Sequence, residues 1–284
     1  MSYPLVSIII PSYNHVTYIK KAVLSAINQT YKNIELIVID DGSTDGSNEL
    51  LTSLAQKYTF TYIHRQNKGL IATLNEALLY TQGHYFCMLG SDDYYELNKI
   101  ELQVNYLQEH QEIALCYGEL TYIDGDGKIK KRGKTKYFKQ GMIFKHLLKT
   151  CFIPLPTVMV KTDIVKEFGG FDNRFFLEDY PLWLKISQKY PIGYINKNLT
   201  FYRLHQNNVS GDIIKMITEV EKILADYKNV PEYKNVMNKN YLRWFADLSK
   251  TKNKDITNIY MLKAFPSSFY KPRFLHSILR YYFR

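Results

Sequence analysis

Ser7-Ile-Ile-Ile-Pro-Ser-Tyr-Asn14 is the most informative segment of the chain. Its β-branched run is typical of a strand buried on both faces, as in a parallel sheet. Apolar runs that end in polar groups recur at Ile37-Val-Ile-Asp-Asp-Gly-Ser-Thr-Asp45, Leu89-Gly-Ser-Asp-Asp93 and Phe176-Leu-Glu-Asp179. Open α/β sheets bind ligands at the carboxyl ends of their strands. We therefore expect these polar groups to gather at one edge of a sheet.

Composition limits the class of protein and of partner. The 284 residues are 46% hydrophobic and 23% charged, as in ordinary globular proteins, and they include 25 tyrosines that suit stacking on sugars or bases. The formal charge of +10 predicts an anionic partner: a nucleotide, a phospholipid surface or a nucleic acid. Three widely spaced cysteines, Cys87, Cys116 and Cys151, predict reduced and buried thiols.

The sequence shows no pattern of secretion or of membrane insertion. The first apolar run, from Leu5 to Ile10, is too short for a signal peptide and is halted by Pro11. No apolar run approaches the roughly 20 residues that span a bilayer. We therefore expect a cytoplasmic protein that reaches the inner membrane only peripherally, on its cytoplasmic face.

Strand and helix patterns alternate along the first half of the chain, which predicts an α/β fold: a Rossmann-like, mainly parallel sheet with flanking helices. Asn14 is expected to cap the first helix. A domain is predicted at 1–211, and a helical, basic C-terminal extension at 212–284. The predicted strands are 6–10, 34–39, 60–64, 84–89 and 113–117, and the later helices are 47–58, 70–81 and 98–110.

Two basic segments leave alternatives open. Asp124-Gly-Asp-Gly127 predicts a type I′ hairpin turn, since a calcium loop would need further ligands, and the basic stretch 128–139 after it is either a solvated loop or a flap over an anionic donor. After Asp255 there is no carboxylate, and cations alternate with aromatic residues. The extension therefore contacts a membrane or an acceptor, or it packs on the core.

Polar side chains after the first two strands suit a nucleobase. Tyr13 offers a ring for stacking, and Asp40 and Asp41 offer acceptors for an imide N–H. Gly42 permits a tight turn. A plain helix-capping turn is the alternative for Asp-Asp-Gly-Ser.

Three later groups suit a reaction on phosphates. Asp92 and Asp93 provide hard oxygen ligands for Mg²⁺ or Mn²⁺. Asp179, after Glu178, is a candidate general base, although a carboxylate at a helix start can also serve the helix dipole. Arg203 and His205 could contact a diphosphate, and His205 is a candidate metal ligand.

With these motifs in this order, the chain resembles a family 2 glycosyltransferase of the GT-A fold from about Val6 to Ser210. Any one motif is weak, and it is the series of seven that carries the resemblance. The matching segments are Pro11-Ser-Tyr-Asn14, Asp40 to Asp45, Asn67 to Asn75, Gly90-Ser-Asp-Asp93, Gly169 to Asp172, Glu178-Asp179 and Tyr202 to Ser210.

The resemblance implies a role for each matched residue. Tyr13 would stack on uracil, Asp41 would bond it, Asp93 would ligate Mn²⁺ or Mg²⁺, and Asp179 would be the base. The family often has Asp where this chain has Gly90, so the D-x-D motif is incomplete. The predicted nucleotide site also includes Pro11, Asn67, Gly69 and Asp92, and the predicted diphosphate site is Arg203 and His205.

The resemblance implies an inverting transfer of a sugar from a nucleotide-diphosphate sugar, expected to be a UDP-sugar. The expected acceptor is a hydroxyl of a glycan or lipid-linked saccharide in bacterial surface polysaccharide synthesis. The alternatives are a sugar-nucleotide nucleotidyltransferase, for which no Gly-rich N-terminal loop followed by a basic residue is seen, and a basic nucleic-acid-binding protein. A nucleic acid is not an expected partner, because acidic clusters at strand ends would repel its phosphates.

Overall fold

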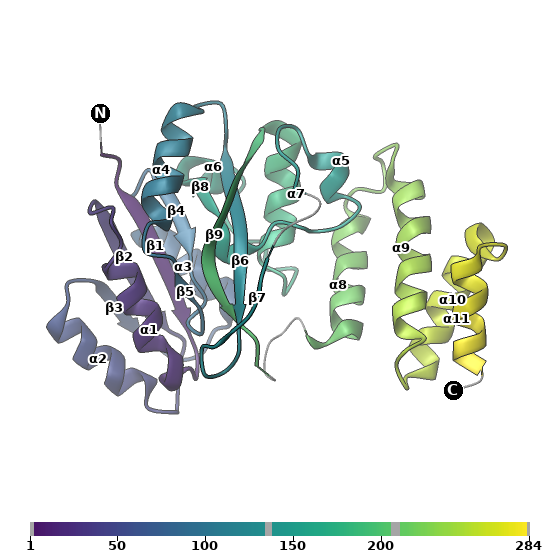
Figure 1. The fold of residues 1–284 in the computed structure, drawn as a ribbon, viewed down its shortest axis with the longest axis horizontal. Coiled ribbons are helices and arrows are strands. Elements are labelled where there is room, and N and C mark those ends of the chain that lie inside the picture. The colour runs from purple at the N-terminus through teal and green to yellow at the C-terminus, as the bar shows by residue number, and fades with distance from the viewer. Residues whose placement is uncertain (1–2, 134–137, 206–210, 283–284) are drawn as a thin grey trace. The chain divides into compact units, whose positions relative to one another are not determined.

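The computed structural model describes residues 3–133, 138–205 and 211–282 (Figure 1). The chain forms two compact units: residues 1–144 with 152–205, and residues 145–151 with 206–284. All described strands belong to the first unit, and the described part of the second unit is helical. The end of the Tyr202 to Ser210 motif lies outside the described residues.

Four parallel strands form one half of the sheet, in the order β3-β2-β1-β4. Ile8, Ile9 and Ile10 are fully buried, as expected for a strand that is covered on both faces. Ser12 pairs with Asp40 in the register, so the residues that follow β1 and β2 leave the sheet at the same edge. The strands are β1 (Val6–Ser12), β2 (Ile34–Asp40), β3 (Thr61–His64) and β4 (Tyr85–Met88).

Helices connect and cover these strands (Figure 1). α1 buries Ile19 and Val23 at the predicted helical spacing. Asn14 is not its N-cap: it has a left-handed φ of 53°, and its side chain accepts a hydrogen bond from the N–H of Thr44 at 2.8 Å. The Asp45 carboxylate instead accepts from the N–H of Val16 at 2.9 Å. The helices are α1 (Val16–Ile27), α2 (Ser47–Lys57), α3 (Leu70–Tyr80) and α4 (Lys99–Glu109).

The other half of the sheet makes it mixed rather than mainly parallel. β8 runs antiparallel to its neighbours β4 and β6, β5 runs antiparallel to β9, and β6 and β9 are parallel. Strands of two or three residues, such as β5 and β8, are too short for a periodic pattern, so their direction could not be predicted. The elements are β5 (Tyr94–Tyr95), β6 (Leu115–Ile123), the 3₁₀ helix Leu155–Thr157, β8 (Met159–Lys161), α6 (Thr162–Glu167), α7 (Asp179–Lys189) and β9 (Ile192–Arg203).

β6 and β7 (Ile129–Arg132) form the predicted hairpin, but its turn is not type I′. The carbonyl of Asp124 accepts from the N–H of Gly127 at 3.0 Å. A type I′ turn needs positive φ at both central residues, whereas within this turn Gly127 alone has one, at 85°. A turn followed by a left-handed glycine explains this pattern. The basic stretch 128–139 thus begins as a strand, and its residues 134–137 lie outside the described residues.

The second unit is held together by a hydrogen-bonded carboxylate and a small aromatic core. Glu221 on α8 accepts from the hydroxyls of Tyr241 on α9 and Tyr260 on α10, at 3.0 and 2.6 Å, and pairs with Lys263 at 2.6 Å. Its helices are α5 (Phe144–Leu147, of which 145–147 belong to this unit), α8 (Ile213–Ala225), α9 (Tyr233–Leu248), α10 (Lys254–Ser268) and α11 (Pro272–Tyr282). No helix in the described ranges is long and apolar enough to cross a membrane.

Two of the three cysteines are placed as the sequence predicts. Cys87 on β4 and Cys116 on β6 are fully buried. Cys151 is exposed, because it lies in an irregular segment after α5.

Candidate active site

Asp41 organises the loop that follows β3. Its carboxylate accepts hydrogen bonds from the main-chain N–H groups of Lys68 and Gly69, both at 2.8 Å. The loop lies so close that a Cβ on Gly42 would come within 2.8 Å of the Asn67 nitrogen, which explains the glycine. Oδ2 of Asp41 accepts one described bond, and a carboxylate oxygen can accept two. Oδ2 therefore has acceptor capacity left for one more donor, at a residue that is 5% exposed.

Arg65 secures this loop against α3. Its guanidinium pairs with Asp41 and, through Nε at 2.8 Å, with Glu76 on α3. The side chain of Thr73 accepts a further bond from Arg65 at 2.8 Å. This network fixes the position of Asp41 before any ligand binds.

The predicted nucleobase residues lie at the carboxyl ends of β1 and β2. Tyr13 directly follows β1 and is 49% exposed, so its ring is open for stacking. Pro11 lies opposite Ile39 in the register. Asn67 is exposed, and Gly69, with a φ of 86°, has open space where a Cβ would stand. A planar group can thus approach this edge without meeting side chains at Gly69.

His15, Asp92 and His205 form a cluster that could hold a metal ion, with ligand atoms within 4.8 Å of one another. His205 Nε2 lies 2.8 Å from Asp92 Oδ2, and His15 Nδ1 lies 2.7 Å from Ser91 Oγ. Burial lowers the pKa of His15 despite the nearby Asp92 carboxylate. A neutral imidazole is the form that binds metals, so the cluster is suited to a cation.

Tyr18 on α1 supports this cluster. Its ring stacks on that of His205 with centroids 5.9 Å apart, and the Arg203 guanidinium lies 4.4 Å from its centre. His15 thus lies at the start of α1, and Tyr18, about one turn further along the same helix, supplies the ring that stacks on His205.

Asp93, the predicted metal ligand, is not the carboxylate that the structure pairs with His205. It is 3% exposed, and its Oδ1 accepts from the main-chain N–H of Arg203 at 2.8 Å. Burial and the adjacent Asp92 charge raise the pKa of Asp93 well above its usual range. Asp93 therefore ties the end of β9 to the loop, while Asp92 faces the two histidines.

Arg203 also braces this region. Its Nε donates to the carbonyl of Asp92 at 2.8 Å, and its Nη1 donates to the carbonyls of Asp124 and Gly125 at 3.0 and 2.8 Å. The side chain is 3% exposed. These bonds join the Asp92 loop to the β6–β7 hairpin, and the contact with a diphosphate stays a prediction.

Gly90 explains the incomplete D-x-D motif. A Cβ at this position would lie 2.9 Å from Asp92 Oδ1 and 3.3 Å from Asp93 Oδ2. The space that a side chain would need is thus filled by the two carboxylates that follow it.

Glu178 and Asp179 lie at the start of α7, where both are half-buried. Burial raises the pKa of Asp179 to about 6, and burial together with the Asp179 charge raises that of Glu178 to about 8. Asp179 Oδ1 accepts from the N–H of Tyr180 at 2.6 Å. Within the described residues, no hydrogen bond joins these carboxyls to the His15, Asp92 and His205 cluster.

The segment before α7 is fixed to α3 by one amide. Asn75 Nδ2 donates to the carbonyl of Phe171, and Asn75 Oδ1 accepts from the N–H of Phe171, both at 2.8 Å. Lys185 on α7 in turn pairs with Asp172 at 3.4 Å. The helix that carries Asp179 is thereby linked to the helix that begins at the Asp41 loop.

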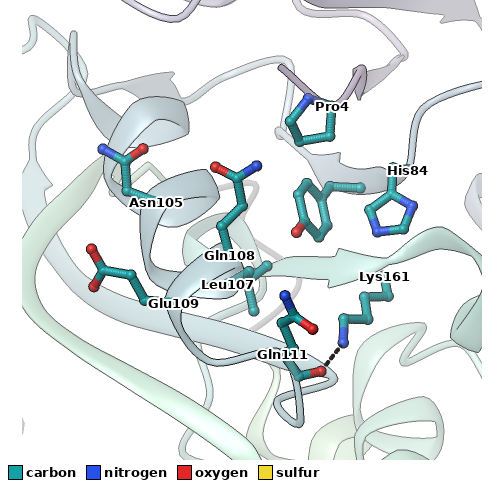
Figure 2. Close-up of a pocket in the computed structure, with 9 residues that line it drawn as sticks. Pro4, His84, Asn105, Leu107, Gln108, Glu109, Gln111 and Lys161 are labelled. Atoms are coloured by element: carbon teal, nitrogen blue, oxygen red, sulfur yellow. Dashed lines mark hydrogen bonds between the residues drawn. The ribbon is translucent and has the colours of Figure 1, made fainter. Parts of the chain in front are cut away.

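A cavity of about 700 Å³, whose lining residues are drawn in Figure 2, lies near the amino ends of β1 and β4. Its lining includes Pro4, His84 and Lys161, and Pro4 and His84 lie just before β1 and β4 begin. Parallel strands place ligands at their carboxyl ends, so this cavity is not the predicted site.

His15 was not among the site residues predicted from the sequence. Its position could have indicated it. His15 lies two residues after Tyr13, and ligands bind at the carboxyl ends of strands in open α/β sheets, so the reason for expecting Tyr13 in the site applies equally to His15. Its role depends on Ser91 and His205, which are distant in sequence, so no local pattern could show it.

Similarity to known proteins identifies the family of the chain. The sequence pattern of the family described as Glycosyl transferase family 2 matches residues 7–169. An uncharacterized glycosyltransferase of Rickettsia bellii is 32% identical over 92% of this chain, and the chain spans 36 to 38% of the length of three such Rickettsia relatives. Escherichia coli WfgD, a UDP-Glc:alpha-D-GlcNAc-diphosphoundecaprenol beta-1,3-glucosyltransferase, is 31% identical over 80% of this chain and 88% of its own length.

Solved structures show the same fold. S. aureus TarS 1–349, in complex with UDP-GlcNAc, has a TM-score of 0.72 at 15% identity and covers 98% of this chain and 88% of its own. The mannosyltransferase PcManGT from Pyrobaculum calidifontis, in complex with GDP-Man and Mn²⁺, has a TM-score of 0.65 at 15% identity and covers 98% and 84%. These likenesses confirm the predicted GT-A fold. The sequence matches show that the chain belongs to glycosyl transferase family 2.

Proposed function

We propose that the chain is an inverting, metal-dependent glycosyltransferase that transfers a hexose or N-acetylhexosamine from a UDP-sugar to a hydroxyl of a glycan or lipid-linked acceptor. The observation that carries the proposal is the gathering of Tyr13, the Asp41 loop and the His15, Asp92 and His205 cluster after β1, β2, β4 and β9. The name of WfgD and the UDP-GlcNAc complex of TarS support a UDP-sugar donor, and the name of WfgD supports a lipid-linked saccharide as the acceptor. Such an acceptor is what we expect for surface polysaccharide synthesis.

The uracil ring of the UDP-sugar is proposed to stack on Tyr13, and its imide N–H to donate a hydrogen bond to the Asp41 carboxylate. The loop 67–69 closes around Asp41 and leaves the space at Gly69 open for the ribose. Arg203 is proposed to place positive charge near the diphosphate, and His205 to lie beside the diphosphate as a neutral ligand of the metal ion.

The donor set of the cluster fits Mn²⁺ better than Mg²⁺. One carboxylate and two imidazoles suit a first-row transition metal, whereas Mg²⁺ prefers oxygen ligands alone. His15, Asp92 and His205 would hold the ion. When bound, it would offset the charge that develops on the leaving diphosphate.

Asp179 is the proposed general base. It removes the proton from the acceptor hydroxyl, whose oxygen forms a bond to the anomeric carbon of the sugar. The bond from that carbon to the diphosphate oxygen breaks, and the nucleoside diphosphate leaves with inversion at the anomeric carbon. A carboxyl with a pKa of about 6 is ionised at neutral pH and basic enough for this transfer.

The test is a panel of donors with and without Mn²⁺: UDP-glucose, UDP-galactose, their N-acetyl forms, dTDP-rhamnose and GDP-mannose. We expect Mn²⁺-dependent release of UDP from at least one UDP-sugar, and calorimetry should show that His205→Ala weakens UDP binding in Mn²⁺ at least tenfold. His110→Ala, an exposed histidine at the end of α4, is the matched control.

Two results would contradict the proposal. One is the absence of turnover with every donor while random DNA binds tightly and in a salt-dependent manner. The other is equal UDP affinity of His205→Ala and wild type in Mn²⁺, which would remove the cluster from the donor site.

A further inference from the structure

We propose that α10 and α11 form a docking surface for an anionic lipid bilayer, which is called here the α10–α11 surface. It consists of exposed apolar side chains on both helices, bordered by cations. Its members are Ile259, Leu262, Phe265, Phe269, Lys271, Arg273, Leu275, Leu279, Arg280 and Tyr282. The inference concerns the second unit alone and goes beyond the sugar transfer.

The side chains of α11 form three stripes along the helix: one buried, one apolar and exposed, and one polar. Phe274 and Ser277 are buried in the unit. Leu275, Leu279 and Tyr282, spaced i, i+4, i+7, are 51%, 57% and 63% exposed. At 100° per residue, these three cover one face of the helix. A helix that needed only to pack on its own unit would not require a second apolar face.

α10 repeats the arrangement. Its buried side chains include Tyr260 and Ala264, whereas Ile259, Leu262 and Phe265 are 47%, 61% and 53% exposed. Phe265 also contacts the ring of Phe274 on α11, with centroids 6.1 Å apart. The two helices therefore pack together and still direct large apolar groups away from their core.

The positive charge of the α10–α11 surface favours an anionic partner. From Lys254 to Tyr282 the chain has one acidic residue, Asp255, at the first turn of α10. Arg273, His276 and Arg280 form the polar stripe of α11, next to its exposed apolar stripe. Basic residues beside aromatic and leucine side chains are the pattern of a helix that lies in the plane of an anionic membrane surface.

A second copy of the chain fits this surface less well. In a two-fold dimer the same patch meets itself, so the cations of one copy would face those of the other. An anionic bilayer instead complements the cations and accepts the apolar side chains. It would also bring the protein to lipid-linked molecules.

The experiment is sedimentation of the full chain with vesicles of phosphatidylcholine, alone or with phosphatidylglycerol, in the absence of any sugar donor. We expect at least tenfold tighter partition onto vesicles with about 30% phosphatidylglycerol, because each basic residue near an anionic surface adds attraction. The preference should fall as salt is raised. No step of this measurement depends on catalysis.

Two pairs of variants separate the contributions. Leu275→Ser with Leu279→Ser should lose about tenfold in partition onto anionic vesicles, whereas Leu79→Ser with Leu97→Ser, at 83% and 60% exposed positions of the first unit, should not. Lys271→Gln with Arg273→Gln should lose most of the preference for phosphatidylglycerol. Lys234→Gln with Lys239→Gln on α9 is the charge control.

Each variant is checked by its circular dichroism and melting temperature, which should match wild type because the altered side chains lie on the surface. The proposal is overturned if wild type does not prefer anionic vesicles, or if the α11 variants bind them as the controls do. A concentration-dependent dimer that the Leu275 and Leu279 variant abolishes, without vesicle binding by wild type, would assign the surface to self-association.

Discussion

Asp179 and Glu178 are adjacent carboxyls, and substitution can tell their roles apart. Asp179→Asn keeps the shape of the side chain but removes the base, so transfer should fall by about 10² to 10⁴. UDP binding in Mn²⁺ should remain nearly unchanged, because no described bond links Asp179 to the His15, Asp92 and His205 cluster. Turnover and calorimetric affinity are the two measurements.

Glu178→Gln is the matched control for this substitution. It removes the neighbouring carboxyl and leaves the proposed base in place. If Asp179→Asn retained more than a tenth of wild-type turnover while Glu178→Gln lost activity, the base would be Glu178.

The raised pKa of Asp179 predicts the pH profile of transfer. A base works in its ionised form, so activity should be full above the pKa and should fall as the pH drops below about 6. An ordinary aspartate would keep activity down to a pH of about 4. The measurement is kcat/KM for the donor from pH 4.5 to 8.5. The proposed assignment is wrong if the acid limb lies near 4, or if Glu178→Gln removes it.

At the scale of elements, the second unit depends on Glu221, which joins α8 to α9 and α10. Glu221→Gln removes the charge that binds Lys263 and weakens two tyrosine hydrogen bonds, so it should cost about 1–3 kcal/mol of stability. Hydrogen exchange at the α9 and α10 amides should accelerate accordingly, while β1 exchange should not change.

The control for Glu221 is Asp247→Asn, whose described ion pair is with the exposed Lys250 at i+3. An exposed pair of this kind contributes about 0.5 kcal/mol or less. Equal exchange in the two variants would show that Glu221 does not join the helices.

Periodicity predicted the elements well where they are long. β1, β2 and the helices α1 to α4 lie close to the predicted ranges, because buried β-branched runs and helical spacing reflect the burial of their own side chains. Local chemistry was less reliable at their ends. Asn14 adopts a left-handed conformation and bonds to Thr44, and it is Asp45, 29 residues beyond Val16, that accepts a hydrogen bond from the first N–H of α1.

For the whole molecule, the sequence predicted the GT-A fold and the polar residues that follow β1, β2 and β4, but not which side chains meet. Phe176-Leu-Glu-Asp179 was expected to end a strand, yet it follows none: it lies between α6 and α7, and Asp179 begins α7. The family's roles for Tyr13, Asp41 and Asp179 stay predictions, supported by exposure, an open acceptor and a raised pKa. Asp92 rather than Asp93 faces the histidines because the N–H of Arg203 binds Asp93. The last residue of β9, 110 residues away, therefore determines which of the two aspartates faces the histidines, and the spacing of residues within a motif could not predict this.

The paired hydrogen bonds of Asn75 have a further consequence. Its side-chain amide both donates to and accepts from the main chain of Phe171, as a neighbouring strand would. Two segments separated by 96 positions, α3 and the segment before α7, are thereby held together. If the proposed donor binds against the first turn of α3, a shift of α3 should reach the start of α7 through Asn75 and the pair of Lys185 with Asp172. Donor binding should then change the position of Asp179, the proposed general base, although no described bond joins it to the His15, Asp92 and His205 cluster.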